Sequence, residues 1–108
     1  MLKYNMYSDN THVGFFFVEE GIDKDKFTAT LLKPHPTFAY ILKGDCGDID
    51  EQAMADWVYE RIVPPTRQNI EMLLEKMGLN DYDQLDILKF TGGRSVHDDL
   101  WIDFSQTM

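Results

Sequence analysis

Side chains that could do chemistry are scattered along this chain rather than gathered in a recognisable motif. His97, Asp98 and Asp99 are three metal-ligand types side by side, but successive residues of a helix do not face one another. Residues 44–50 read GDCGDID, which lacks the regular oxygen spacing and distal glutamate of a calcium loop. TGGR at 91–94 lacks the Lys-Ser/Thr of a phosphate-binding loop. We therefore predict no catalytic residue, no metal and no cofactor.

The charge balance narrows the choice of partners. The chain has 10 basic and 19 acidic residues, for a net charge of −9. Residues 51–108 are the more acidic half, with 5 basic and 11 acidic residues. Direct binding to nucleic acid or to an anionic membrane needs a basic surface, so both are disfavoured. Solubility explains such a charge, and so does a basic protein partner or mimicry of nucleic acid.

Length and cysteine content indicate one intracellular domain. The 108 residues and 44% hydrophobic content fit a single folded unit over 1–108. No apolar run reaches the ~20 residues of a membrane span, and the first residues lack the pattern of a signal peptide. Cys46 is single, so no internal disulfide can form. Together these features predict a cytoplasmic location.

The first half, residues 1–44, is expected to form an antiparallel sheet. Asp9-Asn10 is a turn signal between two segments with β character, so these should pair as a hairpin. Gly21 ends the second segment, and Pro34 and Pro36 end the third. The expected strands cover residues 2–8, 11–19, 26–33 and, as a short fourth, 37–42.

The second half, residues 48–104, is expected to be helical. Apolar residues recur there at helical spacing between capping residues and glycines. The expected helices run from the Asp50 cap to about 62, from 65 or 66 to Gly78, and from Asp81 or Asp83 to TGG, with a last short turn capped by Ser95 that carries Leu100 and Trp101. The predicted fold class is therefore α+β: an antiparallel N-terminal sheet of three to four strands, followed by three to four helices packed on one face.

The segment HVGFFFVEE, residues 12–20, is apolar on both faces of its predicted strand, although half-buried strands usually alternate. Val13 adds a third large residue to the face of Phe15 and Phe17, so that face is predicted to be core. Phe16 is then expected to point outward. The second face is either covered by the loop at 34–42 or free to dock a protein partner or a second copy of the chain. The docking strip is predicted to contain Phe16, Val18 and Tyr7.

A structural corner is predicted around Pro64-Pro65. Arg61 and Arg67 flank it, and Asp98, Asp99 and Glu60 are candidate partners. We expect Arg61 or Arg67 to bond to an acidic residue of the last segment, with Asp98 or Asp99 favoured. An exposed arginine without such a role is the alternative for each. Trp57 and Trp101 are expected to anchor the core.

Exposed acidic side chains in the second half are the other predicted partner-binding residues, because they would steer the association of a basic partner. They are Asp81, Asp83, Asp86, Asp98 and Asp99.

The run from Trp57 to Trp101 resembles the N-terminal segment of HipA-like proteins of Gram-positive bacteria. The matching skeleton is Trp57, Arg61, Pro64, Arg67, Leu74, Gly78, Leu79, Ser95, an aspartate and Trp101. The hairpin KYNMYSDNTHVGFF is also similar. HipA-type toxins are Ser/Thr kinases, and some related systems carry the N-terminal subdomain as a separate protein that restrains the kinase. The chain departs from a full kinase, since it has no nucleotide site or catalytic loop, so only the binding half of that function is implied.

These observations predict a small, acidic, non-enzymatic protein that binds and inhibits another protein. In one version its partner is a toxin kinase, as the resemblance implies. In the other it is an inhibitor encoded by a phage or other mobile element that blocks a nucleic-acid-binding enzyme, as acidic anti-CRISPR proteins do. That version depends on charge and size alone. A small enzyme or metal protein is the least favoured class.

Overall fold

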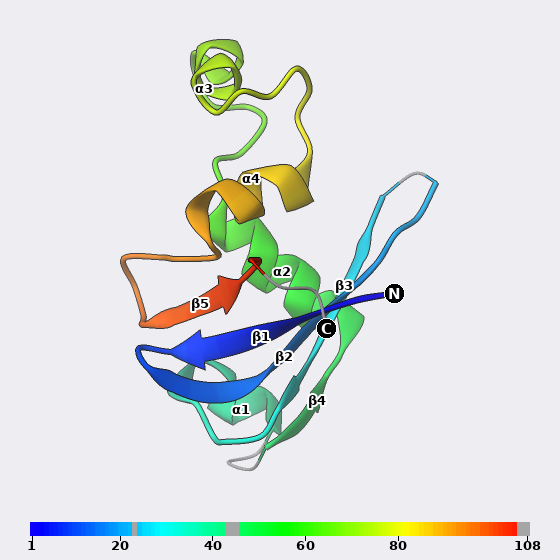
Figure 1. Cartoon of the computed structure of the whole chain (residues 1–108), viewed down its shortest axis with the longest axis vertical. Helices are drawn as coiled ribbons and strands as arrows, with labels where there is room; N and C mark the ends of the chain where they lie inside the picture. The colour runs from blue at the N-terminus through cyan, green and yellow to red at the C-terminus, as the bar shows by residue number, and fades with distance from the viewer. Residues whose placement is uncertain (23, 43–45, 106–108) are drawn as a thin grey trace.

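The computed structural model describes residues 1–22, 24–42 and 46–105. It has an α+β fold in which a five-stranded antiparallel sheet, in the order β4-β3-β2-β1-β5, is covered on one face by helices (Figure 1). The predicted class is confirmed, with five strands instead of three or four. The elements are β1 Leu2–Ser8, β2 Thr11–Glu19, β3 Lys26–Leu31, η1 Pro36–Phe38, α1 Ala39–Leu42, β4 Gly47–Ile49, α2 Glu51–Arg61, α3 Ile70–Lys76, α4 Gln84–Thr91 and β5 Leu100–Asp103.

The first three strands form where the sequence predicts them. The β1–β2 hairpin turns at Asp9-Asn10, where Asp9 adopts a positive φ of 50° that aspartate tolerates better than most residues. β2 then pairs with β3 along its length. These three strands supply most of the sheet.

Polar caps set the starts of two helices. The Asp50 carboxylate accepts a hydrogen bond from the Ala53 N–H at 2.8 Å and begins α2. Asp83 accepts one from the Asp86 N–H at 3.0 Å and begins α4. Gly92, with φ of 68°, ends α4 in the left-handed conformation common after helices. These expectations are confirmed.

Three local expectations are wrong. Residues 37–42 form η1 and α1 instead of a strand, because His35 caps the turn by accepting the Thr37 N–H, and Pro36 has the backbone angle of a first helical residue. Gly47–Ile49, which is not among the expected strands, pairs with β3 as β4. Leu100–Asp103 is not a helical turn but pairs with β1 as β5. The paired residues are 92 to 98 positions apart in the sequence, so no local pattern identifies them.

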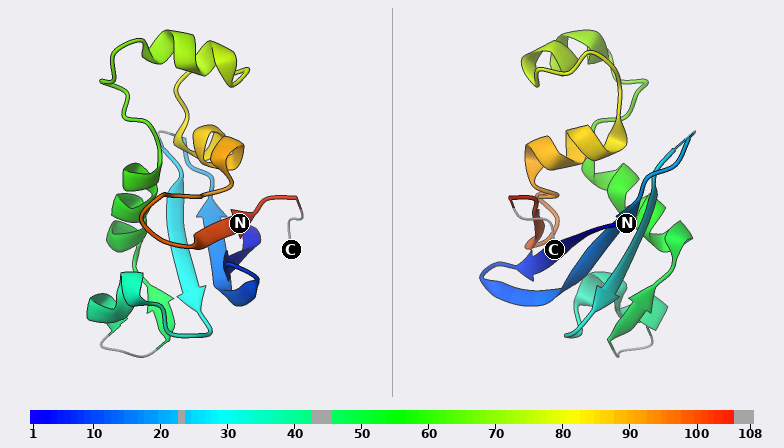
Figure 2. Two further views of the ribbon diagram at one scale, coloured as in Figure 1. Left: turned by 90° about the vertical axis from the view of Figure 1, so that its left-hand side faces the viewer. Right: turned by 45° about the vertical axis from the view of Figure 1, so that its right-hand side comes forward.

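From the sheet outward, α2, α4 and α3 follow one another toward one end of the molecule. α2 packs against β3 and α4 packs on α2, while α3 projects beyond α4 at one end of the molecule (Figures 1 and 2). α3 begins at Ile70, later than expected, after an irregular stretch behind Pro64-Pro65. The Tyr82 hydroxyl donates a hydrogen bond to the Val63 carbonyl at 2.6 Å and joins the two connections that carry α3.

One hydrophobic core lies between the sheet and the helices. Its members from the sheet include Tyr4, Met6 and Phe27, and α2 contributes Met54 and Trp57. In the described part of the chain, no helix has the length and apolar character needed to cross a membrane. We call the side of the sheet that faces α2 the covered face and the opposite side the open face; α1 and α2 lie together along the covered face in Figure 2 (left).

Candidate functional site

The orientation of β2 is opposite to the prediction. Phe16 and Val18 are both 0% exposed and pack on the covered face, where the Phe16 ring lies 6.1 Å from that of Trp57. Phe15 and Phe17 are partly exposed on the open face. The prediction that Phe16 and Val18 belong to an outward docking strip is therefore wrong, and the strip belongs to their neighbours.

A β-bulge causes this reversal. Met6 pairs with Gly14 but Tyr7 pairs with His12, so Val13 is an extra residue opposite β1. Alternation is interrupted there, and Val13, 4% exposed, is buried on the same side as Gly14. The prediction grouped Val13 with Phe15 and Phe17 by assuming unbroken alternation.

Gly14 is needed where the bulge brings two backbones close together. A Cβ atom at this position would lie 2.3 Å from the Thr30 carbonyl oxygen, which is well inside any permitted contact. An isolated glycine within a strand pattern is a known signal of a bulge or of close backbone approach. That signal was present in the sequence and could have identified the correct face.

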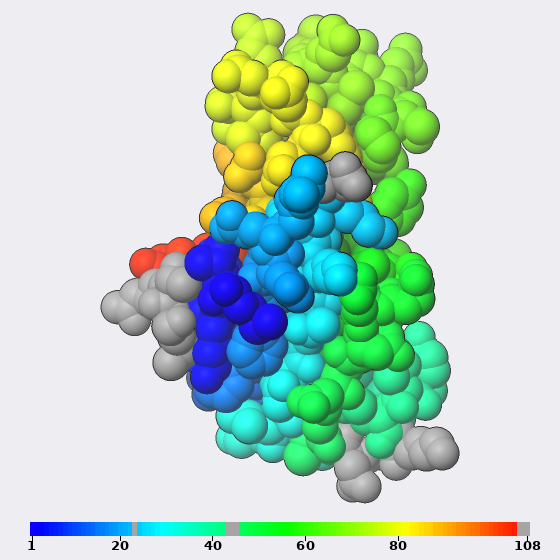
Figure 3. Space-filling model, turned by 90° about the vertical axis from the view of Figure 1, so that its right-hand side faces the viewer, coloured from blue at the N-terminus to red at the C-terminus, as the bar shows by residue number. Residues whose placement is uncertain are grey.

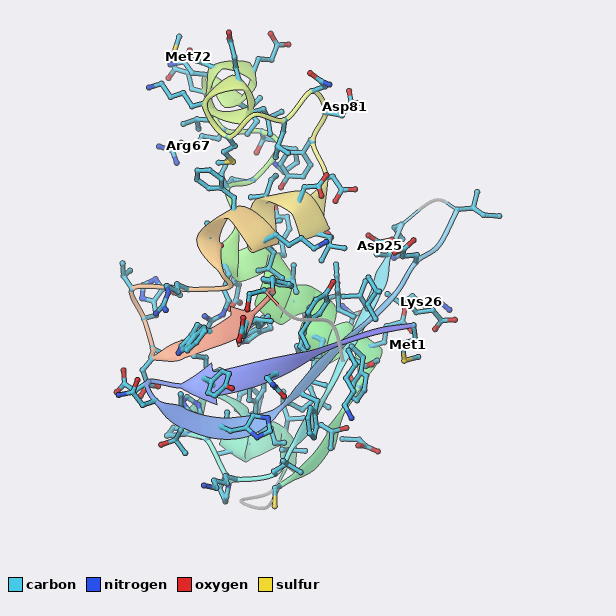
Figure 4. The ribbon with its side chains drawn as sticks, in the orientation of Figure 1. Met1, Asp25, Lys26, Arg67, Met72 and Asp81 are labelled. Carbon is cyan, nitrogen blue, oxygen red and sulfur yellow. The ribbon has the colours of Figure 1, made fainter. Side chains whose placement is uncertain are left out.

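Five ring side chains from three strands form a continuous row on the open face, which we call the aromatic strip. Trp101 stacks on Tyr7 at 4.7 Å between ring centroids, and Tyr7 contacts His12 at 5.4 Å. His12 contacts Phe15 edge-to-face at 5.0 Å, and Phe17 follows at 6.5 Å. Tyr7 is the one predicted strip residue that lies here. The row extends across β5, β1 and β2, which Figure 4 shows side by side.

Both ends of the aromatic strip are covered by cations. The Lys3 ammonium lies 4.0 Å from the centroid of Phe15, and the Arg94 guanidinium lies 4.7 Å from that of Trp101. The Trp101 ring therefore contacts both the Arg94 guanidinium and the stacked Tyr7 ring. Single-stranded nucleic acid needs free ring faces on which bases stack. In the aromatic strip, Lys3 already lies over the Phe15 ring and Arg94 over the Trp101 ring, which disfavours base stacking there.

His12 introduces an unsatisfied polar atom into this strip. Its Nε2 atom is buried and has no hydrogen-bond partner among the described residues. A buried polar atom without a partner costs free energy relative to one that is satisfied. Because the Nε2 atom is already buried in the free chain, a docking surface does not reach it, and it carries no argument for binding.

The predicted corner exists, with Arg61 at its centre. The Arg61 side chain, 4% exposed, forms an ion pair with Asp98 and donates a hydrogen bond to the Gly93 carbonyl at 2.7 Å. It also lies 4.1 Å from the ring centroid of Trp57. We call this arrangement the Arg61 clamp. It confirms the expected pairing of Arg61 with Asp98 and holds the segment before β5 against α2.

The other corner residues have different outcomes. Arg67 is exposed and lies with Met72 in the α3 end of the molecule (Figure 4), and no ion pair of Arg67 is found among the described residues. Trp57 is a core residue as predicted. Trp101 is not, because β5 places it on the open face, where its indole N–H donates to the Asp9 carbonyl at 2.7 Å.

The two aspartates before β5 have separate roles. Asp98 is largely buried in the Arg61 clamp, and its Oδ1 accepts the Leu100 N–H at 3.0 Å. Asp99 is exposed and lies 3.0 Å from His35 Nε2. Because His35 Nδ1 accepts the Thr37 N–H, the Nε2 atom carries the proton that it donates to Asp99. Hydrogen bonds from His35 and Ser8 lower the pKa of Asp99 below its ordinary value.

The remaining predicted acids form a different surface from the strip. Asp81, Asp83 and Asp86 are exposed in the connection to α4 and its first turn, and Asp83 also caps that helix. Asp81 lies at the α3 end, well away from the sheet (Figure 4). The predicted partner-binding residues therefore do not form one surface: Tyr7 lies on the open face, Phe16 and Val18 in the core, and the aspartates at three other places.

No three His, Cys, Asp or Glu side chains among the described residues come together in a way that could hold a metal ion. A hollow of about 300 Å³ between α1 and α2 is lined by Asp50, Asp56, Trp57 and Glu60 with neutral neighbours, and its described lining includes no His, Cys or Lys.

Comparison with known proteins finds no matching family model, no matching curated protein and no matching solved structure. The resemblance to HipA-like proteins, and the partner that it implies, therefore stay predictions.

Proposed function

We propose that this protein is a non-enzymatic, cytoplasmic binding protein that docks on another protein through the open face and inhibits it by occupying its surface. The observation that carries the proposal is the aromatic strip. It is a continuous row of five partly exposed rings on the side of the sheet opposite α2, and contiguous ring surfaces of this kind mark interaction sites. Tyrosine and tryptophan, as in this strip, are the side chains most enriched at binding hot spots.

The loop that could have covered the open face does not do so. Within the 34–42 segment, Phe38 is buried on the covered side, with its ring 6.3 Å from that of Trp57. This segment therefore leaves the open face available to an external protein.

A HipA-type toxin kinase is the partner that the sequence resemblance implies. A matched pair of variants tests this version directly. Phe15→Thr with Phe17→Thr removes two rings while keeping strand propensity, and Phe90→Ala, at a position 61% exposed on α4, removes a ring elsewhere. We expect the wild type and Phe90→Ala to bind a purified HipA-type kinase in calorimetry and to reduce its autophosphorylation, and the double variant to do neither.

Two results would count against this version. Absence of binding by the wild type would remove the kinase as partner. Equal binding by the double variant would remove the open face as the docking surface. Another partner would then be sought by quantitative capture, with the wild type and the double variant as baits. Each protein that only the wild type retains would be purified and its binding reconstituted.

A second candidate, inhibition of a nucleic-acid-binding enzyme, is favoured by the exposed acids at the α3 end. That region projects from the body of the protein (Figure 3), and acids on a projection can reach a basic groove. Asp81→Asn with Asp83→Ser and Asp86→Asn removes three charges and keeps a capping residue at 83. If this version holds, the triple variant binds a basic nuclease more slowly at low salt than the wild type does. Association at the wild-type rate would refute it.

A further inference from the structure

The open face differs from the rest of the molecule in its charge. Alternation along the strands and the position of Arg94 over Trp101 identify the charged side chains on this face. They are Lys3, Lys26 and Arg94 on the basic side, and Glu19, Asp48 and Asp103 on the acidic side. These six charges sum to zero, whereas the chain as a whole carries −9. The aromatic strip lies on an electrically balanced surface of a strongly acidic protein.

From this balance we propose that two copies of the chain pack open face against open face in a weak dimer, and that a partner competes with the second copy for this face. The inference rests on the proposed function, since it concerns regulation of the same surface. Two identical faces with equal numbers of each sign can meet without leaving an excess charge buried. A strongly basic partner surface would gain little electrostatic attraction from this neutral face. It would be attracted to the acidic surfaces elsewhere on the chain instead.

The size of the face fits a weak dimer. The five strands are three to nine residues long and lie ~4.8 Å apart. Together they cover a flat area of roughly 500 Å², before the relief of the side chains is counted. A standard interface buries about 800 Å² per partner, and smaller ones are transient. Packing of two sheets through their outward side chains is a common arrangement in proteins, with the sheets about 10 Å apart. An interface of this size can form at high protein concentration and still be displaced by a partner.

Salt dependence distinguishes this dimer from a charge-driven complex. The two faces are neutral, but each copy as a whole carries −9, so the copies repel one another at low ionic strength. Added salt screens that repulsion and leaves the apolar contact in place. The dimer should therefore become tighter as salt is raised, whereas binding of a basic partner to the acidic surfaces should become weaker.

Sedimentation equilibrium tests the proposal with the variants already described. We expect wild type and Phe90→Ala to approach twice the monomer mass of 12.6 kDa as the concentration rises to about 1 mM, and we expect the dissociation constant to fall several-fold between ~0.05 and ~0.5 M salt. Phe15→Thr with Phe17→Thr should stay monomeric while its circular dichroism matches that of the wild type.

Each contrary result has a definite meaning. A wild-type monomer at every concentration overturns the dimer, and the docking proposal survives if the double variant alone loses its partner. A dimer that persists in the double variant overturns the assignment to the open face. A dimer that weakens with salt overturns the argument from charge balance. If the double variant is unfolded, Trp101→Thr takes its place, because that position is on a different strand and at the other end of the strip.

Discussion

Phe16 and its neighbours Phe15 and Phe17 have identical side chains and opposite environments. Phe16 lies on the covered face, stacked near Phe27 and Trp57 in the core. Phe15 and Phe17 lie on the open face among other rings, with Lys3 above them. The comparison shows that residue type does not determine the role of a strand position here. One inserted residue in the ladder determines which phenylalanines stabilise the fold and which are left to bind.

The largest expected difference between the two faces is in stability. Phe16→Ala should lower the free energy of unfolding by ~3–5 kcal/mol, as for other buried phenylalanines, because it leaves a cavity in the core. Phe15→Ala and Phe17→Ala should each cost about 1 kcal/mol or less, the size of one cross-strand contact. Urea unfolding of the three variants measures this directly, and equal losses at all three positions would show that both faces are core.

The Arg61 clamp supports the open face indirectly, because it holds the segment that leads into β5 and Trp101. Arg61→Ala should cost ~3–5 kcal/mol, since it leaves the largely buried Asp98 carboxylate without its cation. Arg67→Ala changes an exposed side chain and should stay within about 0.5 kcal/mol of the wild type. Thermal and urea unfolding of both variants provide the check. Similar losses for the two would contradict the separate roles given to these arginines.

The bulge that separates the two faces can be tested at Gly14. Gly14→Ala places a methyl group against the Thr30 carbonyl and should destabilise the protein by ~1–3 kcal/mol, as for other overpacked sites. Thr28→Ala, on the open face of the same strand pair, is the matched control and should have a much smaller effect. A Gly14→Ala protein as stable as the wild type would mean that β2 and β3 do not approach so closely at the bulge.

Much of the fold could be predicted from the sequence because its signals are local. The turn at Asp9-Asn10 and the caps Asp50 and Asp83 act on residues within a few positions of themselves. β4 and β5 could not be predicted in this way, since each is short and is defined by pairing with a strand that does not neighbour it in the sequence.

The candidate site was predicted in outline and placed on the wrong residues. A two-residue turn with an unbroken ladder places Phe15 opposite Tyr4, whereas the structure pairs Tyr4 with Phe16. The one-residue difference is the bulge, and it moves every later side chain of β2 to the other face. The sequence predicts Trp101 in the core because nothing local shows that Leu100–Asp103 pairs with β1, and that pairing places Trp101 on the open face.

The smallest expected effect concerns the turn that joins the open face to β5. The pKa of Asp99 is lowered in the folded state, first by the hydrogen bond from His35 and then by that from Ser8. A lowered carboxyl pKa stabilises the fold above the ordinary aspartate value, and that contribution disappears as the pH falls through the folded pKa. Asp99→Asn should therefore make acid unfolding slightly less steep. An unchanged acid transition would show that the contact does not contribute.

Hydroxyl-radical footprinting tests most directly the claim that the open face is a docking surface. Oxidation of each ring is read by mass spectrometry in the dilute free protein and again in the associated state, either the concentrated dimer or a partner complex. The account predicts that Phe15, Phe17 and Trp101 are oxidised in the free protein and protected on association, that Phe16 is protected in both states, and that Phe90 is oxidised in both. Oxidation of Phe16 in the free protein, or unchanged oxidation of Phe15 and Phe17 on association, would contradict it.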